Sequence, residues 1–252
     1  IAKILASGDL DLTFNAAATN VGANGVIRSL AMSGANLYVG GDFTSYRGTT
    51  FNRFVKLDAT TGLAVAGFGG TGFNNSVYTI YVANSNIYIG GTFTTYQGVA
   101  YNRIVKVAEG TAVADTIFSP ATNGFNNTVR TIVADASNVY VGGDFTTYRG
   151  VAQNYLAKLA SDGSVVTFPA ANASIYALAI DGTAVYMGGT VTTLGGVSVN
   201  RIAKASLAGT VDSTFSTATI RGFNSTVTSL LLNGSNLYAG GIFSTYRGAT
   251  AN

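Results

Sequence analysis

Short apolar runs that alternate with turn residues recur along the whole chain. In residues 73–118 the spacing of apolar and polar positions predicts an alternating strand, a strand apolar on both faces, a loop, a third strand and a short outer strand. These elements are expected at residues 77–82, 87–91, 92–99, 102–107 and 112–118. Asn, Ser and Gly residues between the strands favour tight turns. Four antiparallel strands joined in this order form one blade of a β-propeller.

A pair of glycines ends the predicted second strand in every copy of this pattern and defines the repeat period. The pairs are Gly40-Gly41, Gly90-Gly91, Gly142-Gly143, Gly188-Gly189 and Gly240-Gly241. Their spacings are 50, 52, 46 and 52 residues. The 12 residues that follow Gly240 and the 40 residues up to Gly40 add up to another 52. A period of about 50 residues predicts a propeller or a solenoid, in which each unit buries its apolar face only against its neighbours.

The two ends of the chain carry complementary parts of one repeat. Residues 1–14 match the third and fourth strands of a blade, and residues 248–252 reach the start of a third strand. We therefore expect an all-β, five-bladed β-propeller of four-stranded antiparallel blades, closed by pairing of the N-terminal and C-terminal strands in one composite blade. Closure would remove exposed strand edges. The domain is expected to span residues 1–252 and to be a fragment of a larger protein. The alternative is a longer array, or a larger ring truncated to this piece.

Two segments carry a resemblance to a known family. Residues 37–44 read Leu-Tyr-Val-Gly-Gly-Asp-Phe-Thr, and residues 52–58 continue with Asn-Arg-Phe-Val-Lys-Leu-Asp. Together with the Asp-x-Thr-Phe ending at residues 212–215, this unit resembles the delta-60 family of bacterial β-propeller repeats, and its Gly pair is similar to that of kelch repeats. The resemblance implies a propeller within a secreted or surface-attached bacterial protein. It implies no defined activity and assigns no catalytic residue.

Composition and charge narrow the classes of partner. Apolar residues make up 47% of the chain and charged residues 10%, with no Cys, so disulfides and thiolate metal sites are impossible. No apolar run is long enough to span a membrane. The pI of about 9.1 suggests a basic surface, yet the lysines recur at one repeat position. They are Lys3, Lys56, Lys106, Lys158 and Lys204. Because phosphate binding needs clustered cations, we expect no nucleic-acid partner.

The chain offers little for catalysis, because it has no His and only one Glu, Glu109. Asp42 and Asp144 follow the Gly pair in two repeats, and paired carboxylates near a channel could hydrolyse glycans. The other aspartates fall at repeated turn positions, so we expect no enzyme, no metal site and no cofactor. Asn-x-Ser/Thr sequences recur at one turn position, where turn chemistry is favoured over glycosylation. They start at Asn74, Asn126, Asn172 and Asn224.

Two repeat positions are candidate ligand sites. The first is a position on the predicted first strands at which the residue type differs between repeats. Its side chains could form a polar and aromatic rim around a central channel or merely fill the channel. Its residues are Arg28, Tyr78, Arg130, Tyr176 and Thr228. The other is a loop pair whose Tyr could stack on a sugar while Arg binds hydroxyls or carboxylates. The pairs are Tyr46-Arg47, Tyr96-Gln97, Tyr148-Arg149 and Tyr246-Arg247, and blade four has Leu194-Gly195. The alternative is that the Tyr rings pack between blades.

These features favour a non-enzymatic recognition module on the bacterial cell surface or outside the cell. A glycan is the first expected ligand, which would make the module adhesin-like or lectin-like. The alternative is a purely structural or protein-docking propeller within a larger surface fibre or assembly. In both cases the partner is a glycan or protein surface, and the domain belongs to a larger polypeptide or assembly.

Overall fold

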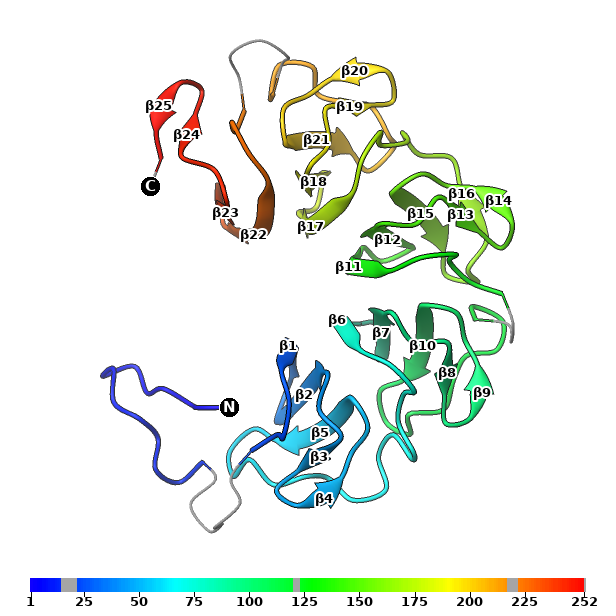
Figure 1. Ribbon diagram of the computed structural model, residues 1–252, viewed down its shortest axis with the longest axis vertical. Coiled ribbons are helices and arrows are strands. Elements are labelled where there is room, and N and C mark those ends of the chain that lie inside the picture. Colours follow the sequence, from blue (N-terminus) through cyan, green and yellow to red (C-terminus); the bar gives the residue numbers. More distant parts are fainter. Residues whose placement is uncertain (15–21, 120–122, 217–221, 252) are drawn as a thin grey trace. The chain divides into compact units, whose positions relative to one another are not determined.

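The computed structural model describes residues 1–14, 22–119, 123–216 and 222–251, and these residues form strands and turns without a helix. No helix long and apolar enough to cross a membrane therefore occurs among them. The chain divides into two compact units, Ile1–Thr122 and Asn123–Asn252. Within each unit, small antiparallel sheets follow one another along the chain (Figure 1). The all-β class is confirmed, and the repeated antiparallel sheets are consistent with propeller blades.

Unit 1 contains the first two blades. Blade 1 runs from β1 to β5 and blade 2 from β6 to β10. The strands are β1 (Ile27–Ser33), β2 (Asn36–Gly41), β3 (Ser45–Tyr46), β4 (Thr49–Thr50), β5 (Phe54–Asp58), β6 (Val77–Ala83), β7 (Asn86–Gly91), β8 (Thr95–Tyr96), β9 (Val99–Ala100) and β10 (Ile104–Ala108). The three longer strands of each blade pair in the orders β1-β2-β5 and β6-β7-β10.

Unit 2 contains the next three blades. Blade 3 runs from β11 to β16, blade 4 from β17 to β21 and blade 5 from β22 to β25. The strands are β11 (Val129–Ala134), β12 (Asn138–Gly143), β13 (Thr147–Tyr148), β14 (Val151–Ala152), β15 (Leu156–Ala160), β16 (Val165–Val166), β17 (Ile175–Ile180), β18 (Ala184–Gly189), β19 (Thr193–Leu194), β20 (Val197–Ser198), β21 (Ile202–Ser206), β22 (Val227–Asn233), β23 (Asn236–Gly241), β24 (Thr245–Tyr246) and β25 (Ala249–Thr250).

The predicted fourth strand is a paired strand only in blade 3 among the described residues, where β16 pairs with β15. In blades 1, 2 and 4 it shrinks to a single β-bridge, such as Val107 with Ala114. The residue after that bridge in blade 2 is Asp115, whose carboxylate accepts the backbone N–H of Phe118 at 3.1 Å. This turn leads the chain away from the sheet. Most blades therefore have three full strands and a fourth that is reduced to a bridge, within the expected four-stranded antiparallel unit.

The predicted loop at residues 92–99 contains a short hairpin, which the sequence reading missed. In blade 2 the hairpin joins β8 to β9, and its two turn residues, Gln97 and Gly98, have φ of 50° and 78°. Two positive φ values in succession define the tight turn that suits a right-twisted hairpin. Gln rarely takes the first position of such a turn, so the turn was not recognised. The hairpin recurs in all five blades.

The Gly pair is required by two different close approaches. A Cβ on Gly41 would collide with the carbonyl oxygen of Val26, and Gly91, Gly143, Gly189 and Gly241 meet the same obstacle at their own blades. This approach accompanies a β-bulge, where Ile27 and Ser29 pair with Gly41 and Gly40 and residue 28 is left over. A Cβ on the first glycine, Gly40, would instead meet the side chain of Val77 in blade 2.

The core of unit 1 lies between blades 1 and 2. Phe54 of blade 1 packs edge-on against Phe73 of blade 2, with ring centroids 5.9 Å apart. We call the stretch that follows the third long strand of a blade its outer segment. Phe68 belongs to the outer segment of blade 1, after β5, and lies in the same buried cluster as Phe73 and Val77. The outer segment of one blade therefore packs against its own blade and against the next one.

We predict that Gly91→Ala destabilises the protein by about 3 kcal/mol or more, because the new methyl group forces apart β7 and the carbonyl of Ser76. Gly110→Ala is the matched control, since nothing lies within 4 Å of its Cβ position, and it should change stability by less than about 0.5 kcal/mol. Urea unfolding monitored by circular dichroism measures both changes. Equal stability of the two variants would contradict this account of the glycine pair.

Candidate functional site

The variable position on the first strands is the extra residue of the β-bulge in every blade. In unit 1 it places Arg28 beside Asp42, the residue after the Gly pair. The guanidinium donates from Nε and Nη2 to the two carboxylate oxygens at 2.7 and 2.6 Å. Its carbon atom Cζ also lies 4.6 Å from the ring centroid of Tyr78 in blade 2. Arg28 therefore joins its own blade to the next through an ion pair and a cation–π contact.

The same arrangement recurs within unit 2. Arg130 donates from Nε to both oxygens of Asp144 at 2.8 Å, and its Cζ lies 4.9 Å from the ring centroid of Tyr176 in blade 4. We call Asp42–Arg28–Tyr78 and Asp144–Arg130–Tyr176 the two braces. In blade 5 the same position is Thr228, whose hydroxyl donates to the carbonyl of Gly240 at 3.3 Å. The sequence variation between blades therefore follows from contacts between neighbouring blades.

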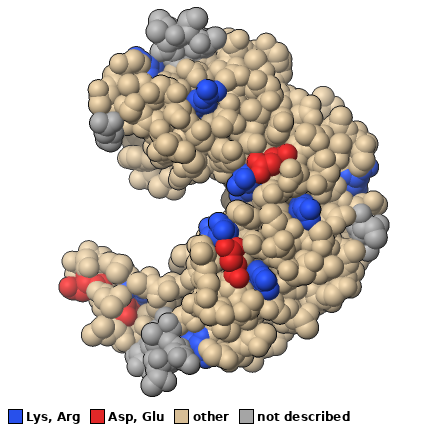
Figure 2. Space-filling model, in the orientation of Figure 1, with Lys and Arg blue, Asp and Glu red and all other residues tan. Residues whose placement is uncertain are grey.

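The braces pair opposite charges. The hydrogen bond from Arg28 holds the pKa of Asp42 below its usual value, and Asp42 in turn raises the pKa of Arg28. Figure 2 shows positive and negative atoms side by side in several places, while some Lys and Arg side chains on the visible face stand apart from any acid. Tyr78 and Tyr176 remain half-buried rather than covered. A polar and aromatic rim for a ligand stays a prediction, and each unit has one accessible ring at this position.

Three of the four Tyr rings of the loop pairs are packed in the interior, and Tyr246 is half-buried. Tyr46, Tyr96 and Tyr148 are each 1% exposed. Their hydroxyls donate to the backbone carbonyls of Gly62, Ala112 and Gly163 at 2.9, 2.9 and 3.1 Å. Burial raises the pKa of Tyr96 and Tyr148 to about 12. A sugar could not stack on these three rings, so the geometry favours the packing alternative stated above.

The residues that follow these Tyr side chains lie close to them. Gln97 donates from Nε2 to the Tyr96 hydroxyl at 2.8 Å. The guanidinium carbons of Arg149 and Arg247 lie 5.0 and 5.2 Å from the ring centroids of Tyr148 and Tyr246, respectively. Arg247 also donates to the carbonyl of Phe215 at 3.2 Å. Arg47 occupies the same turn position at φ 51°. Ligand binding by these pairs stays a prediction, and the contacts give it no support.

The Asn residues at the turn before each first strand have a structural role. The Oδ1 atom of Asn74 accepts the backbone N–H groups of Thr94 and Thr95 at 2.9 and 3.0 Å, and its Nδ2 donates to the Thr94 hydroxyl at 2.7 Å. Asn126, Asn172 and Asn224 make the corresponding bonds in their own blades. The turn prediction is confirmed. Attachment of a glycan to Nδ2 would compete with this hydrogen bond.

Three of the repeated lysines pair with outer-segment aspartates, and the first of them is Lys3, which reaches Asp11 at 2.9 Å. Lys106 reaches Asp115 at 2.8 Å, and Lys204 reaches Asp212 at 3.6 Å. Lys56 instead lies 4.5 Å from the ring centroid of Phe68. Among the described residues no group of three or more Asp or Glu side chains could hold a metal ion. The described Asp side chains thus serve turns and ion pairs, Glu109 accepts a hydrogen bond from the Tyr38 hydroxyl at 3.3 Å, and the absence of catalysis stays a prediction.

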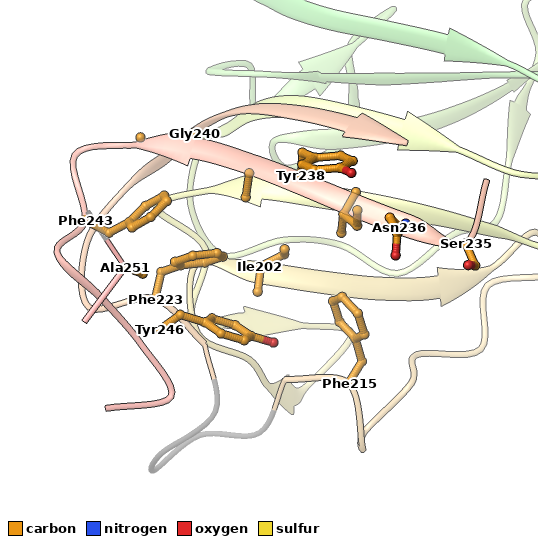
Figure 3. A pocket seen from close by; sticks show the side chains of 13 residues that line it. Ile202, Phe215, Phe223, Ser235, Asn236, Tyr238, Gly240, Phe243, Tyr246 and Ala251 are labelled. Atoms are coloured by element: carbon orange, nitrogen blue, oxygen red, sulfur yellow. The ribbon is translucent and has the colours of Figure 1, made fainter. Parts of the chain in front are cut away.

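Unit 2 has a groove beside β23. It has a volume of about 1180 Å³, and β23 pairs only with β22 in the described part of the chain. Figure 3 shows the rings of Phe215, Phe223 and Tyr246 lying along this strand, with Ile202 among them. In the complete blades this place belongs to the third strand and the outer segment. The sequence reading did not identify the groove, although it placed the end of the chain near the start of a third strand.

Comparisons with known proteins agree with the β-propeller class. The model of a family described as a domain of unknown function (DUF5122) beta-propeller matches residues 138–165. This match runs from β12 to the first residue of β16 in blade 3, and the more specific resemblance to delta-60 repeats stays a prediction. No curated protein sequence matches the chain.

Solved structures are similar to this chain at low sequence identity. One is the extracellular domain of a protein described as a hybrid two-component system of B. thetaiotaomicron, with 18% identity, a TM-score of 0.52 and coverage of 85% of this chain and 26% of that one. The chain thus spans about a quarter of that structure's length. Another is the computationally designed Ika4 protein, with 15% identity, a TM-score of 0.47 and coverage of 76% and 91%.

We predict that the contact between Arg28 and Tyr78 couples their contributions to stability. Unfolding of Arg28→Met, Tyr78→Leu and the double variant should give a coupling free energy of about 0.5 to 1 kcal/mol, the range for a partly exposed cation–π pair. A control cycle of Arg28→Met with Thr111→Ala, a turn residue on the outer side of blade 2, should be additive. Additive behaviour of the first pair would show that the brace does not join the blades.

Stability should be constant between about pH 5 and 9 and fall on both sides, because the chain has no His. Burial raises the pKa of Asp181, but bonds from Thr183 and Tyr186 outweigh it and lower that pKa to about 2. Because the pKa of Asp181 is lower in the folded protein than in the unfolded chain, its carboxylate stabilises the folded protein above about pH 4. This contribution disappears as the pH falls through the folded-state pKa. The raised pKa of Tyr96 stabilises below about pH 10, and this contribution disappears as the pH rises toward 12. Thermal melting across the pH range measures the profile, and a transition near pH 6.5 would contradict it.

Proposed function

We propose that the five repeats form one closed β-propeller that acts as a non-enzymatic recognition module outside a bacterial cell, with a glycan as its ligand. The observation that carries this proposal is that charged side chains in the described residues form ion pairs with one another. Each brace pairs an Arg with an Asp, and Lys106 and Lys204 pair with aspartates of the outer segments. A surface with few free charges and many hydroxyl and amide groups suits a neutral, hydroxyl-rich ligand.

The half-buried rings of Tyr78 in unit 1 and Tyr176 in unit 2 are the aromatic parts of two equivalent proposed ligand sites, one in each unit. Each ring contacts an Arg that is held by an Asp, so its orientation is fixed before a ligand arrives. Fixed aromatic side chains lose little conformational entropy on binding. Tyr rings also combine an apolar face with a hydroxyl group, which matches the alternating apolar and polar faces of a sugar.

The proposed location draws support from the similar solved structure, which is an extracellular domain of a bacterial protein. The chain is also free of Cys, so an oxidising environment would form no disulfide in it. The second candidate function is a structural or protein-docking propeller within a surface assembly. The open groove beside β23 favours this candidate if another chain occupies it.

A glycan array with the purified protein tests the proposal. We expect a defined set of glycans to bind, and the Tyr78→Ala/Tyr176→Ala variant to bind them roughly tenfold more weakly for each ring that contacts the sugar. Tyr46→Phe is the control, because it keeps the buried ring and should leave binding unchanged. Alanine at Tyr46 would be uninformative, since it would open a cavity in the core.

Two results would overturn the carbohydrate proposal. One is the absence of binding to every glycan by a folded protein. The other is binding that the Tyr78→Ala/Tyr176→Ala variant retains in full. Either result leaves the protein-docking function as the remaining candidate.

A further inference from the structure

Blades 2 and 4 each carry an Arg, just before the third strand, that pairs with no acid of the described residues. Arg103 precedes β10 and Arg201 precedes β21, and both are half-buried. None of the ion pairs in the described part of the chain includes either of them. Each donates from Nη1 to one backbone carbonyl, Arg103 to Phe93 at 3.2 Å and Arg201 to Thr190 at 3.0 Å. A guanidinium has five N–H donors, so this bond positions the group and leaves further donors for a ligand.

The backbone at both residues has a conformation that Arg seldom adopts. The φ angles of Arg103 and Arg201 are 67° and 63°, in the left-handed region that favours Gly and Asn. A Gly would make the same backbone hydrogen bonds without strain. Unfavourable conformations of this kind concentrate at functional sites. The presence of Arg here therefore indicates a role for the side chain itself.

Blade 1 shows which group belongs beside an Arg at this position. The equivalent residue is Arg53, whose carbonyl accepts the N–H of Gly41 at 3.0 Å and whose own N–H donates to the carbonyl of Phe43 at 2.8 Å. Asp42 lies between these two bonds along the chain. The hydrogen bond from Arg28 lowers the pKa of Asp42, and the charge of Arg53 lowers it further. A carboxylate in this place is thus within electrostatic reach of the Arg.

Blades 2 and 4 have the same backbone frame without the acid. In blade 4 the N–H of Gly189 donates to the carbonyl of Arg201 at 3.0 Å, and the N–H of Arg201 donates to that of Val191 at 2.9 Å. The residue between these bonds is Thr190, and in blade 2 it is Thr92. Both blades therefore keep the cation and lack the carboxylate that blade 1 supplies to it.

The blades that lack this acid are also the blades with the half-buried ring at the bulge. Tyr78 begins the first strand of blade 2 opposite the glycine pair, and Arg103 begins the third strand on the other side of that pair. Because neighbouring strands are antiparallel, both residues lie at the same edge of their sheet. Blade 4 repeats this placement with Tyr176 and Arg201. We call Tyr78 with Arg103 in unit 1, and Tyr176 with Arg201 in unit 2, the two Tyr–Arg sites.

We propose that each Tyr–Arg site binds an acidic sugar, whose carboxylate pairs with the Arg while the Tyr ring stacks on the sugar ring. This inference rests on the proposed function, because it assigns one acidic residue of the same glycan ligand. The rest of the glycan can be neutral, since Arg28 and Arg130 beside the rings are already paired with aspartates.

A carboxylate is favoured over other anionic groups for two reasons. The planar fork of a guanidinium matches the two oxygens of a carboxylate. Each site also supplies a single unpaired Arg, which balances one negative charge rather than the nearly two of a phosphate monoester. Asp42 beside Arg53 shows that the fold accepts a carboxylate next to this Arg position.

Glycans that differ in a single group test the inference. The probes are the uronic acid and sialic acid glycans of the array, each compared by titration calorimetry with its carboxyl-reduced, neutral counterpart. We expect the acidic member of a pair to bind roughly ten- to hundredfold more tightly, the range for hydrogen bonds to a charged group. Added salt should reduce this preference, because the sites are partly exposed to solvent.

Two double variants assign the preference to these residues. Thr92→Asp/Thr190→Asp gives blades 2 and 4 the acid of blade 1, so the protein's own carboxylate should weaken binding of the acidic glycan about tenfold or more. The uncharged Thr92→Asn/Thr190→Asn variant is the matched control and should retain the preference. Arg103→Asn/Arg201→Asn suits the left-handed backbone, should remain folded by circular dichroism, and should bind acidic and neutral members equally.

Several outcomes would overturn the inference. Equal binding of both members of each pair, or binding of neutral glycans alone, would reject the acidic sugar and leave the recognition function in place. Tighter binding of sulfated than of carboxylated glycans would assign the sites to sulfate instead. A preference that Arg103→Asn/Arg201→Asn retains would place the carboxylate at another cation. Only the absence of all glycan binding rejects the proposed function as well, so the two failures are distinguishable.

Discussion

The close approach of two backbones at each Gly pair is the constraint on which the rest of the structure depends. The second glycine allows the carbonyl of the residue before the first strand to lie where a Cβ would be, and this permits the β-bulge. The first glycine leaves room for a Val or Ile side chain of the next blade, as Gly40 does for Val77 and Gly188 for Val227. One dipeptide thus sets the strand geometry within a blade and the packing between neighbouring blades of a unit.

The bulge determines where the charged residues lie. It turns residue 28 toward Asp42 and toward the ring of Tyr78, and it does the same for Arg130 in unit 2. A substitution at one of these positions therefore also alters the packing of the next blade. The Lys side chains have an equivalent role at the outer side of the blades, where they lie near an Asp or an aromatic ring. The net charge of +3 comes from residues that occupy scaffold positions, so it indicates little about a partner.

The sequence alone was sufficient to predict the first three strands of blade 2, because alternation and the Gly pair mark them clearly. β6 and β7 begin and end within one residue of the ranges expected from residues 77–82 and 87–91. The fourth strand was not predictable in this way, because Asp115 ends the pairing through side-chain bonds to its own turn. The candidate site was harder to predict from the sequence than the strands. Tyr46 and Tyr78 look alike as residue types, yet one ring is 1% exposed and the other is half-buried beside an Arg.

Equivalent positions in the repeats distinguish residues that maintain the fold from residues that bind a ligand only when the side chains at those positions do not contact one another. The bulge position alternates Arg, Tyr, Arg and Tyr from blade 1 to blade 4, because each Arg stacks on the Tyr of the following blade within its unit. A ring with an odd number of blades cannot maintain this alternation around its full circumference. One blade must carry neither residue, or two of the same kind would become neighbours. Blade 5 carries Thr228 at the bulge and Ile242 in place of the aspartate. If the repeats close into the proposed ring of five, this exception falls at the one place where the alternation must break.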